Sequence, residues 1–195
     1  PMLPEVWEAM LPFYSTKSAN PASSHRFGQQ ARRALDDARE KTAVFLGAFA
    51  DEVVFTSGAT EANNLALFGC LQPLRPAHVV SSPIEHSCVS EPLKHFSTVG
   101  FQVELTAVDN IGVASPALVR QVLRPETRLA AIMLANHETG AVQPVTEIAE
   151  VIRSTSPQCH YHCDAAAAVG KMPVSFHALG PATMTLSAHK FHGPK

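Results

Sequence analysis

The chain has 195 residues, of which 46% are hydrophobic and 16% are charged, and its formal net charge is −2. This composition is typical of a globular protein, and the length predicts one domain or one and a half. The small net charge gives no reason to expect nucleic acid or an anionic membrane as a partner, and the longest apolar runs are far shorter than the roughly 18 residues of a transmembrane helix. We also expect no signal peptide at the start of the chain.

Helical and extended patterns alternate along the sequence. Amphipathic or capped stretches predict helices at residues 4–13, 27–46, 59–71, 87–98, 116–123 and 145–154. Short apolar runs predict strands at residues 52–55, 78–81, 102–106, 129–135, 161–163 and 183–186. Alternation of this kind predicts an α/β domain with a mainly parallel sheet.

The cysteines do not suggest a metal or disulfide framework. Cys70, Cys88, Cys159 and Cys163 form no CxxC pair, so their spacing does not suggest a zinc site. For a domain of this size we expect reduced thiols, as in a cytosol.

Ligands of open α/β sheets collect at the carboxyl ends of the strands, so the residues that follow each predicted strand are the candidates for a site. After residues 52–55, small residues and Thr60 open a helix, which suits a phosphate cradle. The alternative is a tight turn with Thr60 as N-cap. After residues 78–81, His86 is placed to stack on a flat ligand or to move protons, and the alternative is a structural histidine.

Three further strand ends carry polar residues. Asn136 follows residues 129–135 and either contacts a ligand or caps a loop. Asp164 follows residues 161–163 and either caps a short helix or pairs with a cationic ring nitrogen. Lys190 follows the last predicted strand and, once deprotonated, could form a Schiff base, although most lysines are simply solvated. A phosphate cradle, a stackable ring, an acid and such a lysine together describe one cofactor, pyridoxal 5′-phosphate (PLP).

Six ordered motifs carry a resemblance to a known family. They are NPASSHRFG (20–28), FTSGATEANN (55–64), EH (85–86), ANHETGAVQP (135–144), DAAAAVGK (164–171) and SAHKFHGPK (187–195). In order and approximate spacing, the chain resembles the cysteine desulfurase and selenocysteine lyase family of the class V aminotransferase superfamily, whose members are PLP enzymes of fold type I. The resemblance implies the three-layer α/β/α large domain of the PLP-dependent transferase fold, with a mainly parallel sheet.

The resemblance also implies a role for each matching residue. Lys190 is expected to form the Schiff base with PLP and to act as the catalytic proton shuttle, whereas Lys195 is not the cofactor lysine. Asp164 is expected to bind the protonated ring nitrogen. His86 would stack on the ring and assist proton transfer, and Asn136 would lie near the ring hydroxyl and the substrate carboxylate. Thr60, Ser187 and His189 are expected to hold the phosphate of the cofactor. Ala59 is the remaining residue expected to bind the cofactor.

Two departures from the family pattern are visible. The family usually has glutamine as the fourth residue of the Asp-Ala-Ala-Gln stretch, whereas this chain has Ala167. The family's smaller C-terminal domain, with its mobile-loop cysteine and its substrate-binding arginine, has no counterpart here, and neither has the family's N-terminal stretch. We therefore expect residues 1–195 to be a partial PLP-binding large domain, truncated at both ends and inactive alone.

The resemblance implies a parent enzyme that removes sulfur from L-cysteine. Its products are L-alanine and an enzyme persulfide, which supplies iron–sulfur cluster or thio-cofactor assembly through a sulfur-acceptor protein. A selenocysteine lyase, another class V aminotransferase or lyase, and a non-catalytic scaffold that keeps the fold are the alternatives. The expected parent is a homodimer in the cytoplasm, or in mitochondria if it carries a transit peptide.

Overall fold

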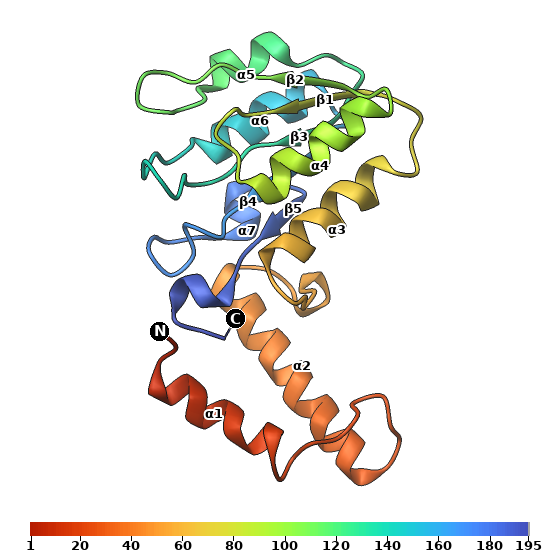
Figure 1. Cartoon of the computed structure of the whole chain (residues 1–195), viewed down its shortest axis with the longest axis vertical. Coiled ribbons are helices and arrows are strands. Elements are labelled where there is room, and N and C mark those ends of the chain that lie inside the picture. The colour runs from red at the N-terminus through yellow and green to blue at the C-terminus, as the bar shows by residue number, and fades with distance from the viewer. Residues whose placement is uncertain (195) are drawn as a thin grey trace. The chain divides into compact units, whose positions relative to one another are not determined.

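The structure is a computed structural model that describes residues 1–194, and it divides into two compact units (Figure 1). The helical unit comprises Pro1–Phe55 together with the residues from Ala188 onward, and the sheet unit comprises Thr56–Ser187. The prediction for Lys195 lies outside the described residues.

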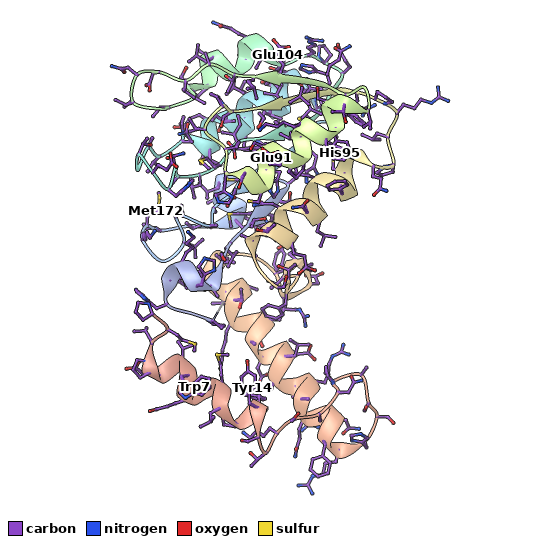
Figure 2. The ribbon with its side chains drawn as sticks, viewed as in Figure 1. Trp7, Tyr14, Glu91, His95, Glu104 and Met172 are labelled. Atoms are coloured by element: carbon purple, nitrogen blue, oxygen red, sulfur yellow. The ribbon has the colours of Figure 1, made fainter. Side chains whose placement is uncertain are left out.

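The helical unit contains two α-helices, α1 (Pro4–Tyr14) and α2 (Arg26–Leu46), and two short 3-10 helices, η1 (Ala50–Glu52) and η2 (Ala188–Phe191). Proline begins α1, where its missing N–H costs no hydrogen bond. Two aromatic side chains of α1, Trp7 and Tyr14, stack with ring centroids 6.4 Å apart (Figure 2). The imidazole of His25 caps α2 by accepting a hydrogen bond from the Gly28 amide, and α2 ends at Gly47 in the left-handed conformation.

The strand predicted at residues 52–55 is wrong. Residues 50–52 form η1, in which the Glu52 carboxylate accepts a hydrogen bond from the Phe49 amide and turns the chain. The carbonyl of Val53 accepts a hydrogen bond from the Arg39 guanidinium at 3.2 Å, so this backbone bonds to α2 rather than to a strand. Residues 53–55 have the extended apolar pattern of a sheet strand, and the sequence alone does not show which segment their backbone bonds to.

The sheet unit alternates strands and helices. Its elements are α3 (Ala59–Leu71), β1 (His78–Ser81), α4 (Ser87–Thr98), β2 (Gln102–Leu105), α5 (Pro116–Val122), β3 (Thr127–Ala131), α6 (Val145–Thr155), β4 (His160–Asp164), α7 (Phe176–Leu179) and β5 (Thr183–Thr185). The five strands stand in the order β2-β1-β3-β4-β5, and every neighbouring pair is parallel. The predicted α/β fold with a mainly parallel sheet is confirmed.

Helices cover both faces of this sheet. Val79 and Val80 are adjacent in β1 and so point to opposite faces, and neither side chain is exposed. On the face covered by α3 and α4, a core forms in which Leu67, Val89 and Leu129 are completely buried. Figure 1 shows α6 behind the sheet and α4 in front of it. Three layers therefore hold the strand ends in place.

Two local differences from the predicted elements occur near the site. The strand β3 ends at Ala131, four residues earlier than expected. The chain nevertheless continues beside β4, because the amides of Ile132 and Leu134 donate to the carbonyls of His162 and Asp164. The four-residue helix α7 was not predicted, since so short a segment carries no periodic pattern.

The strand order reverses between β1 and β3. From β1 the chain passes to β2 on one side of the sheet and then returns to β3 on the other side. At such a reversal the loops that follow the two strands diverge, and ligands of α/β proteins bind in the crevice between them. Among the described residues, no helix combines the length and the apolar character needed to cross a membrane.

Candidate functional site

Asp164 ends β4 at the carboxyl edge of the sheet and is 6% exposed. Its Oδ1 atom accepts a hydrogen bond from the Ala166 amide at 2.9 Å, and its Oδ2 atom accepts one from Asn63 Nδ2 at 2.9 Å. Residues 165–168 form a turn, so Asp164 caps a turn and not the short helix considered as its alternative role. The Cys88 thiol is a third and more distant donor to Oδ2, at 3.8 Å. All three donors are neutral, and no cationic side chain of the sheet unit lies within 4.0 Å of the carboxylate.

The donor to Asp164, Asn63, is itself completely buried in α3. Its Nδ2 atom also lies 3.0 Å from the Sγ atom of Cys88, and its Oδ1 atom lies 2.7 Å from Nε2 of His162. On the far side of the His162 ring, Nδ1 lies 2.9 Å from the hydroxyl of Thr183. Burial lowers the pKa of His162 to about 4, so its ring is neutral at neutral pH.

His86 is exposed and precedes α4 as its N-cap. Its Nδ1 atom accepts a hydrogen bond from the Cys88 amide at 3.2 Å, and Cys88 Sγ lies 3.0 Å from the same nitrogen. Because Nδ1 accepts, the neutral ring carries its hydrogen on Nε2. The ring of His86 meets the ring of His137 edge-on, with centroids 5.3 Å apart. His86 therefore has a structural task at Nδ1 and leaves Nε2 for a ligand.

Glu85 joins the loop after β1 to the chain that follows β3. Its Oε1 atom lies 2.5 Å from the Ser82 hydroxyl and accepts a hydrogen bond from the Met133 amide at 2.9 Å. Its Oε2 atom is shielded from solvent and has no hydrogen-bond partner among the described residues. Burial raises the pKa of Glu85 to about 8, and the nearby charge of Asp164 adds to the effect. Glu85 is therefore held mainly as the neutral acid at pH 7.

Asn136 follows β3, bonds to the loop that follows β1, and is 7% exposed. Its Nδ2 atom donates to the carbonyl of Ile84 at 3.0 Å, which ties the two diverging loops together. Its Oδ1 atom accepts hydrogen bonds from the amides of Glu138 and Thr139, both at 2.9 Å. The loop-capping alternative is thus realised, and a contact of Asn136 with a ligand stays a prediction.

The first turn of α3 has no side-chain cap. Gly58 is the N-cap residue and offers no side chain, so the alternative with Thr60 as N-cap is wrong. Thr60 is the second residue of the helix and is exposed, whereas Ala59 is half-buried. The Glu61 carboxylate accepts a hydrogen bond from the Ser57 amide. Hydrogen bonds from Ser57 lower the pKa of Glu61. The backbone N–H groups of the first turn of α3 therefore receive no hydrogen bond acceptor from the side chain of the N-cap residue.

The last predicted site residues divide between the two units. Ser187 is 3% exposed and ends the sheet unit, two residues after β5. His189 and Lys190 belong to the helical unit, where both are exposed on η2. In that unit the carbonyl of His192 accepts a hydrogen bond from the Leu3 amide at 3.1 Å. Along the chain, Lys190 follows Ser187 by three residues.

Sequence reasoning missed Asn63, Cys88 and His162 as parts of this site. Asn63 lies within the quoted FTSGATEANN motif, and His162 lies two residues before Asp164 in the same strand. Residues two apart in a strand point to the same face, so this spacing was the available signal. Asn63 and Asp164 are 101 residues apart in sequence, and only the fold brings them together.

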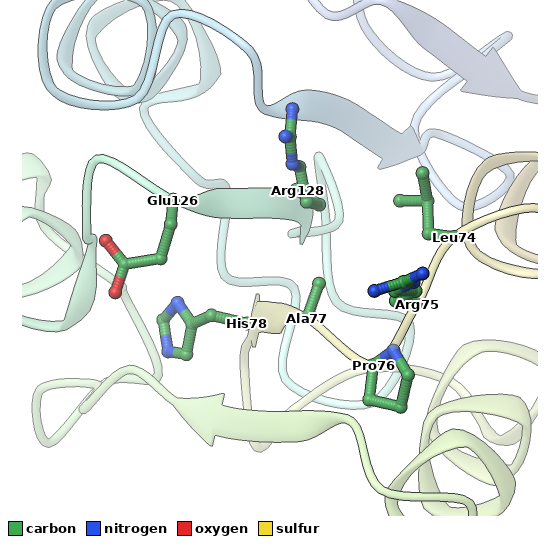
Figure 3. A pocket seen from close by; sticks show the side chains of 7 residues that line it. All are labelled: Leu74, Arg75, Pro76, Ala77, His78, Glu126 and Arg128. Atoms are coloured by element: carbon green, nitrogen blue, oxygen red, sulfur yellow. The ribbon is translucent and has the colours of Figure 1, made fainter.

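A separate cavity of about 310 Å³ lies at the opposite, amino edge of the sheet (Figure 3). Figure 3 shows the side chains of His78, at the start of β1, and of Glu126 and Arg128, around the start of β3. None of the predicted site residues lines this cavity.

Among residues 1–194, no three His, Cys, Asp or Glu side chains gather in a way that could hold a metal ion, and all four cysteines are free.

A model of the aminotransferase class-V family matches residues 1–195. The chain belongs to that family. This class-V chain is 40% identical over 197 residues to a cysteine desulfurase IscS from Dictyoglomus turgidum, and the match covers 100% of the chain and 50% of the relative. It is 36% identical over 198 residues to a probable mitochondrial cysteine desulfurase from Dictyostelium discoideum, of which it covers 44%.

Solved structures agree with these relatives. The class-V chain superposes with a TM-score of 0.95 on a structure described as SspA in complex with cysteine, at 36% identity. The match covers 100% of this chain and 56% of that one. The class-V chain thus spans about half the length of the proteins it matches. The resemblance to the cysteine desulfurases is confirmed at the level of family and fold.

Proposed function

We propose that this class-V chain binds PLP and forms the cofactor-binding part of a cysteine desulfurase. The named relatives and the structure of a relative in complex with cysteine support this function. Lys190 would hold the cofactor covalently through Nζ. Asp164 would hold the ring nitrogen, and His86 would stack on the ring with Nε2 as its free nitrogen.

The observation that carries the proposal is the charge environment of Asp164. A buried carboxylate is normally paired with a cation or protonated, because an unpaired buried charge is costly. Asp164 has three neutral donors, the Ala166 amide on Oδ1 and Asn63 Nδ2 and the Cys88 thiol on Oδ2, and the sheet unit offers no cation within 4.0 Å. A protonated pyridine nitrogen would supply the missing positive charge. The residues present therefore fit the ring of PLP.

The start of α3 fits the other end of the cofactor. The helix has 13 residues and begins without a side-chain cap, so backbone N–H groups and the positive end of the helix dipole are available to an anion. We assign Ala59 and Thr60, with Ser187 and His189, to the phosphate. The helix α3 would thereby serve both ends of the cofactor, because it also carries Asn63, the donor to Asp164.

The residues of this chain would divide the chemistry as follows. When bound, PLP supplies an electron sink that stabilises negative charge at the substrate Cα atom. Asp164 would keep the ring nitrogen protonated by its negative charge. The Nζ atom of Lys190 would remove and return a proton at Cα. Asn136, whose Nδ2 atom is fixed by the carbonyl of Ile84, would orient the substrate carboxylate.

The overall reaction takes sulfur from L-cysteine. Cysteine and an enzyme thiolate give L-alanine and an enzyme persulfide, so that the sulfur atom moves from the substrate to the thiolate and Cβ gains a proton. The persulfide would then pass to a sulfur-acceptor protein for iron–sulfur cluster or thio-cofactor assembly. We further propose a homodimer, in the cytoplasm or in mitochondria.

The test compares Asp164→Asn with a matched control, Asp109→Asn. Asp109 also caps a turn, since its Oδ1 atom accepts hydrogen bonds from the amides of Ile111 and Val113. Asparagine keeps an acceptor for the Ala166 amide but removes the charge. We expect Asp164→Asn to fold and to bind PLP at least about tenfold more weakly, and, when introduced into the full-length parent, to abolish sulfide release from cysteine. Asp109→Asn should retain PLP binding and, in the full-length parent, sulfide release; equal behaviour of the two variants would contradict the proposal.

A further inference from the structure

A row of four side chains leads from the first residue of the edge strand β5 to Asp164. Thr183 of β5 lies 2.9 Å from Nδ1 of His162, Nε2 of His162 lies 2.7 Å from Oδ1 of Asn63, and Nδ2 of Asn63 lies 2.9 Å from Oδ2 of Asp164. His162 and Asn63 are 1% and 0% exposed, so water cannot replace these bonds. Of the four, only Asp164 would touch the cofactor in the proposed function.

Each hydrogen in this row can be assigned. Oδ2 of a charged Asp164 can only accept, so the Asn63 atom beside it must be the Nδ2 donor. This fixes the Asn63 amide with its Oδ1 atom toward His162. A carbonyl oxygen carries no hydrogen, so Nε2 of His162 must donate to it. His162 is neutral at neutral pH, so its Nδ1 atom keeps a lone pair and accepts the Thr183 hydroxyl hydrogen.

His160 extends this row of hydrogen bonds beyond Thr183. The Thr183 hydroxyl has a single hydrogen, which goes to His162. His160 Nε2 lies 2.8 Å from the Thr183 oxygen and must therefore donate to it. All the hydrogen bonds from His160 through Thr183, His162 and Asn63 thus point toward Asp164, an arrangement in which neighbouring bonds strengthen one another.

We propose that Asn63 and His162 are positioning residues that hold Asp164 as a charged carboxylate, available to a cationic ring nitrogen. This role rests on the proposed function, because the ring belongs to the cofactor. The second hydrogen on Nδ2 of Asn63 is directed at Cys88 Sγ, 3.0 Å away, so the amide is held at three points. A neutral donor of fixed orientation stabilises the negative charge of Asp164 without cancelling it. An arginine or lysine in the same place would compete with the ligand.

The first test uses the wild-type protein without cofactor. Nitrogen-15 NMR of labelled histidine distinguishes the two neutral tautomers of an imidazole. We expect His162 to carry its hydrogen on Nε2 at pH 7, and the Nδ2 hydrogens of Asn63 to exchange slowly with solvent. A His162 ring with its hydrogen on Nδ1 would overturn the proposal, because the bond to Asn63 could not then form.

The second test compares two substitutions at one position. His162→Leu removes the donor to Asn63, whereas His162→Gln places an amide N–H near the former Nε2 atom. We expect faster exchange of the Asn63 side-chain hydrogens in the leucine variant, and a dissociation constant for PLP raised roughly ten- to a hundredfold. The glutamine variant should recover most of both properties. Circular dichroism would establish that each variant is folded.

A matched pair of threonines provides the control. Thr127 at the amino edge of the sheet also bonds a buried histidine, since its hydroxyl lies 2.8 Å from Nδ1 of His78. Thr183→Val should weaken PLP binding and free the Asn63 amide, although Thr183 does not touch Asp164. Thr127→Val removes an equivalent bond at the other edge and should leave both measurements at their wild-type values.

The outcomes separate this inference from the proposed function. If wild-type protein binds PLP but His162→Leu and Thr183→Val leave PLP affinity and Asn63 exchange unchanged, the positioning role is overturned and the proposed function stands. Equal losses in Thr183→Val and Thr127→Val would also overturn it, since they would reflect general destabilisation. A wild-type protein that fails to bind PLP would overturn the proposed function and, with it, the role of these residues toward the cofactor.

Discussion

Replacing Glu85 by glutamine should make folding stability less sensitive to pH. The Glu85 carboxyl titrates near pH 4.5 when solvated, whereas burial raises its pKa to about 8 in the folded protein. The folded state therefore holds one extra proton between these values, and wild-type stability falls as pH rises through this window. The stabilising effect of the neutral acid is complete below pH 4.5 and is lost toward pH 8.

The magnitude follows from the displacement of the pKa. Each pH unit above the unfolded-state pKa costs about 1.4 kcal/mol while the folded state stays protonated, so at pH 7 the cost is about 3 kcal/mol. Glutamine does not titrate, and its carbonyl oxygen can still accept the hydrogen bonds from Ser82 and Met133 that reach Oε1. Relative to wild type, Glu85→Gln should therefore gain about 3 kcal/mol between pH 4.5 and pH 7.

The assay is urea unfolding followed by circular dichroism at both pH values. Comparing variant and wild type at each pH cancels the contributions of other titrating groups, including His162. The control is Glu91→Gln, because the Glu91 side chain is 63% exposed and its ion pair with Lys94 lies on the surface. That control should differ from wild type by less than about 1 kcal/mol at either pH. A Glu85→Gln effect that is the same at pH 4.5 and pH 7 would refute the reasoning.

Two further predictions concern His86 and Ala167. His86→Ala removes the N-cap of α4 and should cost about 1 kcal/mol of unfolding free energy, whereas His86→Asn keeps an acceptor for the Cys88 amide and should cost only a few tenths; equal losses in thermal or urea unfolding would exclude the capping role. Ala167 lies half-buried in the turn after Asp164, where the family usually has a glutamine donor. Ala167→Gln should shift the pH titration of the visible absorbance of PLP-loaded protein, and an unchanged titration would show that the position is silent.

Local signals predicted much of the sheet unit. The helices α3 and α4 and the strand β1 have the predicted bounds, because caps, turn residues and clear periodicity define them within a few residues of sequence. The strand ends also placed Asp164, His86 and Asn136 at one edge of the sheet. That prediction followed from the general position of ligands in parallel α/β sheets.

Long-range partners could not be predicted in the same way. The segment at residues 52–55 looks like a strand, but its backbone bonds to Arg39 of α2. The amide orientation of Asn63 depends on His162, which is 99 residues away in sequence. The raised pKa of Glu85 depends on burial beneath the chain that follows β3. Each of these properties arises from packing, which no local pattern encodes.

The central claim is that PLP binds this chain with Lys190 as its covalent partner. The direct measurement is to load the protein with PLP, reduce it with borohydride and map the modified residue by mass spectrometry. We predict visible absorbance on loading and modification at Lys190. Modification at another lysine, such as Lys171, or the absence of any modification would contradict the account.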